Sequence, residues 1–185
     1  MDFLLITHSL DESFSRDTLF KTIVNTPFDD RLQATELGLG IVVLLLVNSK
    51  DHTLDRVALS DTERAQEAQK ISAKPFHEIR IPLDYKENLL IDVVDELKPQ
   101  FTDDWAGMFV PELSPEEARF NQAGASIACS AIYPLIPFGT EDAIGAMIFS
   151  YFEPLEKLGE KHRAFMRAYA DTVSSKLVQN KVIVL

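Results

Sequence analysis

The spacing of apolar residues changes along the chain, and each spacing predicts a different kind of element. Near the N-terminus, apolar residues recur every three to four positions, which predicts a helix ended by Pro27, and a shorter helical segment is expected over about 30–37. The run IVVLLLV over 41–47 is continuously aliphatic and β-branched, which is typical of a central strand covered on both faces. Polar residues 48–52 predict a hairpin loop, followed by a second strand over 53–59.

The middle of the chain carries two helix-start signals. Ser60 and Glu63 have the spacing of a capping box and predict a helix through about 71, and Ser114 and Glu117 predict another helix in the same way. Between these signals the pattern predicts a short strand over 76–81, a helix over 88–97, a brief extended segment over 100–102 and an irregular segment over 103–113.

The last third of the chain predicts a second hairpin and a long helix. The hairpin is expected from strands over 126–136 and 143–152, and the amphipathic helix over 157–181. Two hairpins separated by a largely helical middle predict an α+β fold, with a central antiparallel sheet and helices on both faces. Because no repeat or linker interrupts the chain, we expect one domain over 1–185 with a core of about 16–180.

Charge and cysteine content exclude several classes of function. The 185 residues contain 18 Lys and Arg against 29 Asp and Glu, a formal net charge of −11, which argues against nucleic acid and against anionic membranes as partners. The single cysteine excludes a disulfide framework and a multi-cysteine zinc site. The longest apolar run is too short to cross roughly 30 Å of hydrocarbon, and the N-terminus lacks a signal-peptide pattern, so we expect a cytoplasmic location.

Four segments in this order resemble the GAF domain family, a group of sensory domains related to PAS domains. They are RVALSDTE at 56–63, IPLDYKENLLIDVVDELKPQFTDDW at 81–105, SIACSAIYPLI at 126–136 and IGAMIFSYFEP at 144–154. The resemblance covers about 16–180 and implies an antiparallel sheet of about six strands. It also implies that terminal helices cover one face, and that the middle helices and loops enclose a small-molecule pocket on the other.

The resemblance directs attention to aromatic and polar residues of the middle segment as ligand-binding candidates. Trp105, Phe109 and Phe120 are expected to roof the pocket, and Tyr133 is expected on the strand beneath. Small-molecule pockets are mostly apolar with a few placed polar groups, which Asn121 and Ser130 could supply. The alternative is a roof that fills its own cavity. Because the chain is acidic, an anionic ligand would have to be met by a local group such as Arg56.

No catalytic constellation emerges from the sequence, so we expect no enzymatic activity. Cys129 lies within an apolar strand and is expected in the core, and GAF domains that bind bilins use a cysteine elsewhere. Asp103 and Asp104 form an acidic pair that is expected to be a polar turn or cap. The four histidines lack metal-site spacing, although a single axial histidine leaves haem open, and the cofactor stays unknown.

These observations predict a sensory domain that binds a small molecule and passes its state to a partner. The resemblance implies a homodimer through the terminal helices or a separate effector protein. Met166, Ala170 and Val178 lie partly off the apolar stripe of the last helix, which favours a helix–helix dimer. The alternatives are an enzyme on this fold that uses Cys129 or Asp103, and a ligand-free interaction scaffold.

Overall fold

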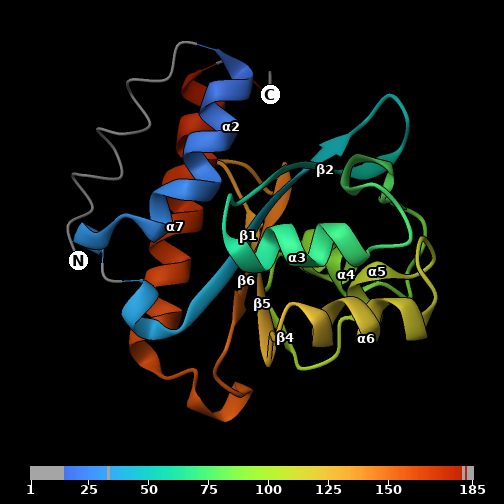
Figure 1. The fold of residues 1–185 in the computed structure, drawn as a ribbon. Coiled ribbons are helices and arrows are strands. Elements are labelled where there is room, and N and C mark those ends of the chain that lie inside the picture. The colour runs from blue at the N-terminus through green and yellow to red at the C-terminus, as the bar shows by residue number, and fades with distance from the viewer. Residues whose placement is uncertain (1–14, 33, 181, 183–185) are drawn as a thin grey trace.

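One antiparallel sheet lies between two layers of helices in the computed structural model, which describes residues 15–32, 34–180 and 182 (Figure 1). The six strands have the order β3-β2-β1-β6-β5-β4. Their bounds are β1 Leu39–Asn48, β2 Thr53–Leu59, β3 Arg80–Pro82, β4 Gln100–Thr102, β5 Cys129–Leu135 and β6 Gly145–Tyr151. All neighbouring strands run antiparallel, so the predicted α+β class and both hairpins are confirmed.

The helices divide between the two faces. The first and last, α2 (Arg16–Asn25) and α7 (Glu160–Gln179), run side by side over one face (Figure 1). The other face is covered by α3 (Glu63–Ile71), α4 (Leu89–Glu96), α5 (Ala106–Phe109) and α6 (Pro115–Gly124). Short 3-10 turns occupy Thr26–Phe28, Asp30–Leu32, Thr35–Leu37, Phe76–Glu78 and Leu155–Lys157. The predicted covering of both sheet faces is therefore confirmed.

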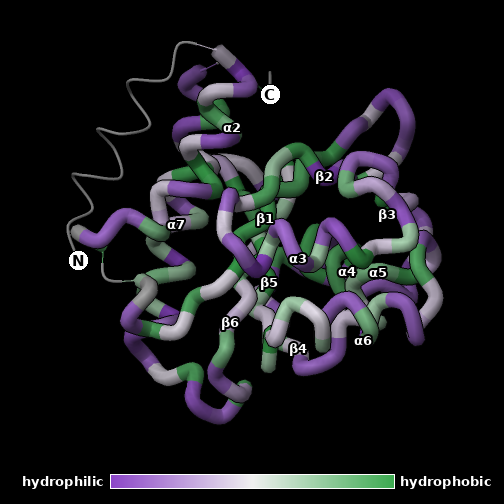
Figure 2. The backbone as a smooth tube through the Cα atoms, in the orientation of Figure 1, coloured by the Kyte–Doolittle hydropathy of each residue, from purple (hydrophilic) through white to green (hydrophobic). Residues whose placement is uncertain are grey.

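Strand alternation sends neighbouring side chains into two separate cores. On β1, Val42 packs with the α2 and α7 side, and Val43 packs with the α3 to α6 side. Their partners on β6 follow the same division, since Val42 pairs with Phe149 and Val43 with Ile148. Because both faces of the sheet are covered, the central strand β1 is hydrophobic almost without interruption, and Figure 2 shows hydrophobic residues along it.

A bulge on β2 changes which side chains face the α3 to α6 side of the sheet. Leu45 pairs with Arg56 and Leu44 with Ala58, so Val57 has no partner of its own on β1. Alternation is therefore shifted by one residue, and both Arg56 and Leu59 face the α3 to α6 side. This shift positions the site described below.

The close pairing of β1 and β6 requires a glycine at one point. A Cβ added at Gly145 would lie 2.1 Å from the backbone oxygen of Leu45. No side chain fits in that space, so glycine allows the two central strands to pair here.

Several sequence expectations need correction. The helix predicted to be capped by Ser60 begins at Glu63 with Thr62 as N-cap, because the Ser60 hydroxyl instead accepts a hydrogen bond from the Val42 N–H at 3.0 Å. The strand predicted over 76–81 is a 3-10 turn followed by β3, and the segment predicted to be irregular contains α5. The capping box at Ser114 is confirmed. The helical expectation for residues 1–14 lies outside the described residues.

Within the described part of the chain, none of the helices has a stretch long and apolar enough to cross a bilayer.

Candidate ligand-binding site

A cavity of about 50 Å³ lies between the sheet and the α3 to α6 layer. Strands β1, β2 and β6 form its floor. Helices α3, α5 and α6 and the segment from Phe76 to Ile79 contribute to its walls. Its apolar lining consists of Ile41, Val43, Leu59, Ala68, Phe76, Ile79, Trp105, Met108, Phe109 and Ile148. The polar lining consists of Arg56, Gln69, Ser72, Asn121 and Ser150. An apolar cavity with a few polar groups is the usual composition of a small-molecule site.

Arg56 places a guanidinium group in this wall, and no carboxylate of the described residues forms an ion pair with it. Its side chain is buried, with 6% of the residue exposed, and its Nε and Nη2 atoms have no hydrogen-bond partner in the described structure. The Cζ atom lies 4.0 Å from the centre of the Phe109 ring, which gives a cation–π contact. Burial lowers the pKa of Arg56 to about 9, so the group is still a cation at neutral pH.

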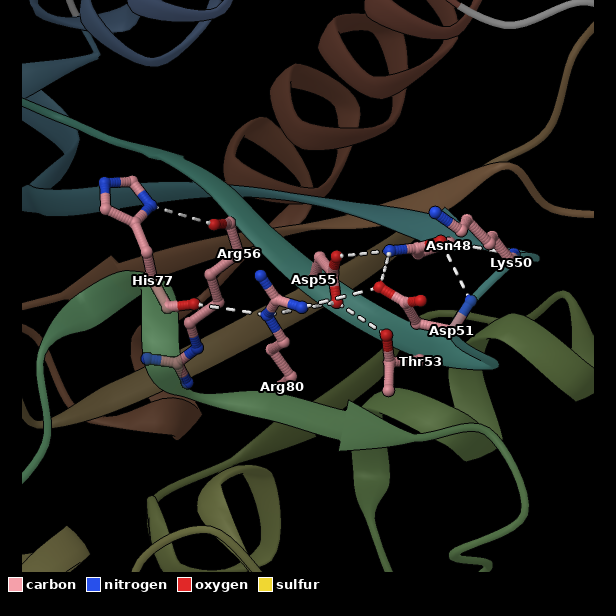
Figure 3. Close-up of polar contacts among 8 residues, drawn as sticks. All are labelled: Asn48, Lys50, Asp51, Thr53, Asp55, Arg56, His77 and Arg80. Carbon is pink, nitrogen blue, oxygen red and sulfur yellow. Dashed lines mark hydrogen bonds and ion pairs between the residues drawn. The ribbon is translucent and has the colours of Figure 1, made fainter.

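The nearest acidic residues in sequence do not neutralise Arg56. Asp55 points to the other side of β2, where its carboxylate accepts hydrogen bonds from Asn48 Nδ2 at 2.9 Å and from Thr53 Oγ1 at 2.7 Å (Figure 3). Asp51 and Asp55 also pair with Arg80, at 3.5 and 4.0 Å. Among the eight residues drawn in Figure 3, none forms a hydrogen bond or an ion pair with the Arg56 guanidinium. The contact drawn for Arg56 joins its backbone oxygen to His77 Nδ1, at 3.3 Å. The acidic cluster of the hairpin is therefore satisfied without Arg56.

Two further buried polar atoms of the cavity lining have no hydrogen-bond partner in the described structure. They are Ser72 Oγ, just after α3, and Asn121 Oδ1, on α6. A buried polar atom without a partner costs about 1–3 kcal/mol. Since three polar side chains with unmet hydrogen bonds line one cavity, an occupant with complementary polar groups would recover part of that free energy.

Trp105 forms a fixed wall of the cavity. Its indole Nε1–H donates to Ser130 Oγ at 2.9 Å, and its backbone N–H donates to Gln122 Oε1 at 2.8 Å. The ring stacks on Phe109 with centroids 5.3 Å apart. Ser130 in turn shares a hydrogen bond of 2.7 Å with Ser150. These contacts fix the position of Trp105, and Trp105 in turn supports Phe109, which is the cation–π partner of Arg56.

The structure brings together some of the predicted site residues and separates others. Trp105, Phe109 and Asn121 line the cavity, and Ser130 lies behind Trp105 as its hydrogen-bond acceptor. Phe120 is 64% exposed because it points outward from α6, while Asn121 next to it points inward. Tyr133 lies on the opposite face, where its hydroxyl donates to the Arg163 backbone oxygen at 3.5 Å. The expectation that Phe120 and Tyr133 enclose the cavity is therefore wrong.

Arg56 is the most informative residue of the site, and the sequence indicated it only as a group that could contact an anionic ligand. Arg56 alternates with Leu54 and Ala58 on a strand, and a cation at an inward-facing position is a signal of a special role. Ser72 and Met108 gave no such signal, because they lie outside any strand or long helix and only the fold brings them to the cavity.

The two residues of the enzyme alternative lie away from the cavity. Cys129 is buried on the opposite face, its thiol donates to the Glu153 backbone oxygen at 3.1 Å, and burial raises its pKa to about 11. Asp103 is exposed, and its neighbour Asp104 accepts from the Ala106 N–H at 2.9 Å. The Arg119 side chain also donates to Asp104 at 2.7 Å, and this hydrogen bond lowers the pKa of that carboxyl. Asp104 thus holds the polar turn that precedes α5.

The side chains that favoured a helix–helix dimer are occupied within one chain. Met166 and Ala170 are buried in the core beneath α7, and Val178 packs against the same core. Tyr169 ties α7 to α2 through a hydrogen bond of 2.6 Å from its hydroxyl to the Ile23 oxygen. The inference from these three side chains to a dimer is therefore wrong, because they pack within the chain. A homodimer through the terminal helices stays a prediction.

We next consider whether the described residues could bind a metal ion or a haem. Among them, no group of three or more His, Cys, Asp or Glu side chains could hold a metal ion. Of the described histidines, none lines the cavity: His52 lies in the first hairpin turn, and His162 contacts the Leu37 oxygen at 3.1 Å. His8 lies outside the described residues.

Comparisons with known proteins identify the fold. The GAF domain of a phosphoenolpyruvate-protein phosphotransferase from Coxiella burnetii superposes with a TM-score of 0.65 at 14% identity, over 97% of this chain and 92% of that one. The GAF domain of a two-component sensor histidine kinase from Bacillus halodurans gives 0.57 at 11%, over 85% and 95%. The protein has a GAF-like fold. Residues 122 to 287 of a methyl-accepting chemotaxis protein match this GAF-like domain with a TM-score of 0.63 at 16% identity, over 97% and 99%.

Comparison by sequence adds nothing to this result. No protein-family model matches the chain, and no curated protein matches it. The GAF-like domain therefore shares its fold with these structures at identities where function does not follow from fold.

Proposed function

We propose that this GAF-like domain is a non-enzymatic sensory domain that binds a small molecule in the cavity between the sheet and the α3 to α6 layer. The observation that carries the proposal is the buried, unpaired guanidinium of Arg56 in the cavity wall. Structures with the same fold come from a sensor histidine kinase and a chemotaxis protein, which supports a role in signal transduction. A cytoplasmic location is part of the proposal.

Contacts across the sheet offer a route for the signal. Ile148 and Ser150 of β6 line the cavity, while Phe149 between them packs on the other face. The Phe149 ring lies 6.1 Å from Phe165 and 6.2 Å from Tyr169, both on α7. A ligand that shifts β6 would therefore alter the packing of the terminal helices, where a second copy or a separate effector protein could detect the change.

The proposal is preferred over both alternatives on specific grounds. An enzyme that uses Cys129 would need a thiolate near the cavity, but this thiol is buried on the opposite face with a raised pKa. A ligand-free scaffold would be expected to fill its interior and pair its polar groups, but this cavity keeps three side chains with unmet hydrogen bonds.

Thermal unfolding with a metabolite library tests the proposal, because a ligand that binds only the folded state must raise the melting temperature. The single tryptophan, Trp105, lines the cavity and supplies a second readout by fluorescence. We expect at least one compound to change both signals in the native chain. Ala68→Leu, which extends a side chain into the cavity, should abolish both responses. A library without any such compound would count against ligand binding.

A further inference from the structure

The wall of the cavity specifies the charge of its occupant. Arg56 is the one charged side chain among the described residues that line it, and its Nε and Nη2 atoms are buried without an acceptor. A carboxylate presents two oxygens in the geometry that a guanidinium group binds through two parallel hydrogen bonds. The Phe109 ring already covers one side of the guanidinium, so the free donors on its edge are left for a ligand.

The same lining limits the ligand to a single negative charge. A phosphate dianion would bury two negative charges against one positive charge, because no lysine or second arginine of the described chain lines the cavity. An ammonium group on the ligand would be buried without a partner, because no described carboxylate lines the cavity either. The charge balance therefore favours a monocarboxylate over a phosphate ester or a zwitterionic amino acid.

Size and polarity define the rest of the molecule. A cavity of about 50 Å³ is far too small for a nucleotide, a haem or a bilin. It admits a short-chain acid only when a wall residue such as the exposed Gln69 of α3 moves aside. The floor of the cavity is aliphatic, with Ile41, Val43 and Ile148 side by side on β1 and β6. A short branched hydrocarbon tail matches this floor. Asn121 Oδ1 lacks a donor, and a hydroxyl on the ligand would supply one.

Resting on the ligand-binding function proposed above, we infer that the cavity takes a small monocarboxylate with a short apolar tail, and that Arg56 holds its carboxylate. Ser72 Oγ can donate a further hydrogen bond to the ligand, since it has no partner in the described structure. Arg56 then serves as the residue that determines specificity for an acid. In the complex, the Arg56 guanidinium pairs with the carboxylate of the ligand.

Calorimetric titration of the full chain with five probes tests this inference. The probes are isovalerate, 2-hydroxyisovalerate, isovaleramide, valine and inorganic phosphate. We expect both acids to bind, and 2-hydroxyisovalerate to bind more tightly because its hydroxyl can reach Asn121. Isovaleramide has the same shape without the charge, so its affinity should be at least about 30-fold lower. Valine and phosphate should show no binding.

Matched substitutions at Arg56 and Arg80 test whether the affinity for the carboxylate depends on Arg56. Arg56→Met should lower the affinity for isovalerate at least about 30-fold, because the charge-assisted hydrogen bonds are lost. Arg80→Met makes the same change of net charge on a half-exposed side chain outside the cavity, and should leave the affinity within about twofold. Arg56→Lys keeps the charge but loses the planar pair of donors, so it should fall between them. If Arg56→Met does not fold, Arg56→Lys carries the same test, and the comparison of isovalerate with isovaleramide tests the role of the charge in the native chain.

The outcomes separate this inference from the proposed function. Equal binding of isovalerate and isovaleramide, or an unchanged affinity in Arg56→Met, would overturn the carboxylate assignment and leave a ligand-binding domain. Binding of valine or phosphate in preference to the acids would overturn the limit to one negative charge. If neither these probes nor the metabolite library binds, water fills the cavity and both proposals are wrong.

Discussion

Val42 and Val43 are neighbours on β1, yet they border faces of the sheet that are packed in different ways. Val42 faces α2 and α7, where aromatic rings fill the space: Phe149, Phe165 and Tyr169 have centroids 5.6–6.2 Å apart. Val43 faces the cavity beneath α3 and α5. One strand thus supports a filled layer on one side and an incompletely filled layer on the other.

The two faces also differ in the polar groups that they leave unpaired. On the filled face, Tyr151 Oη, Ser174 Oγ and His162 Nδ1 lack partners in the described structure. On the cavity face, Ser72 Oγ and Asn121 Oδ1 also lack partners, and so do Nε and Nη2 of the Arg56 guanidinium cation. Because an unpaired charge costs far more to bury than a hydroxyl, stability alone does not explain Arg56. The comparison teaches that the packing of the filled face serves stability, and that the cavity face carries a buried cation which stability does not account for.

Truncation of the two valines tests the difference in packing most directly. Val42→Ala should lower the free energy of unfolding by about 2–3 kcal/mol, because the well-packed surroundings cannot close the new space. Val43→Ala should cost about 1 kcal/mol, because this side chain already borders a cavity and has fewer contacts to lose. Urea unfolding of the two variants measures both values. Equal losses would mean that the two faces are packed alike.

Removal of the Arg56 charge tests the difference in polarity. Without ligand, Arg56→Met should raise the free energy of unfolding at pH 7 by about 1–2 kcal/mol, because an unpaired buried charge is replaced by an apolar side chain of similar length. Arg80→Met is the control, since it removes a cation that pairs with Asp51 and Asp55 at the surface. A loss of stability in Arg56→Met would assign Arg56 a structural role instead.

The same variant carries a pH dependence of defined sign. Burial lowers the pKa of Arg56 to about 9 in the folded state, below its usual value, so the folded state releases this proton first. Stability of the wild type should therefore rise relative to Arg56→Met as the pH increases above about 9, and the gap between them should narrow by roughly 1 kcal/mol at pH 10. Below pH 8 the gap should stay constant. Urea unfolding at pH 7, 8 and 10 measures it.

Cys129 gives the smallest expected effect and tests the enzyme alternative. Cys129→Ala should lower the free energy of unfolding by about 1 kcal/mol, for loss of a small buried group, and leave binding in the cavity unchanged. The thiol is buried and its pKa is raised to about 11, so it should react with a thiol-specific dye at pH 8 only after unfolding. Rapid labelling of the native chain, or loss of binding in the variant, would restore the thiol as a candidate functional group.

Local patterns accounted for the elements but not for the assembly of the site. The run over 41–47, the capping box at Ser114 and the amphipathic last helix each predicted its element, because apolar spacing and caps act within a few residues. The prediction that Ser60 caps the helix was wrong because Ser60 and Thr62 both precede Glu63 and both carry a hydroxyl group. The Val42 N–H of β1 binds the Ser60 hydroxyl, so Thr62 is the cap. Such a choice depends on a contact far away in sequence.

Strand parity could have corrected one site residue in advance. Ser130 and Tyr133 are three positions apart on one strand, so they face opposite sides of the sheet and could not both lie beneath one pocket. Because side chains alternate along a strand, Arg56 and Leu54 lie on the same side of β2, which is the side that faces α3 to α6. The bulge at Val57, which turns Leu59 to the same side, had no signal in the sequence because it depends on the register with β1.

The sequence by itself determined the strands, most of the helices and the α+β class, because these follow from apolar periodicity and local capping. It also determined that one arginine would lie in an apolar strand of an acidic chain. Only the tertiary structure decided that no carboxylate among residues 15–32, 34–180 and 182 reaches this arginine, and that Ser72 and Asn121 line the same cavity. The physical reason is that burial and hydrogen bonding depend on distances between segments, which local sequence does not fix.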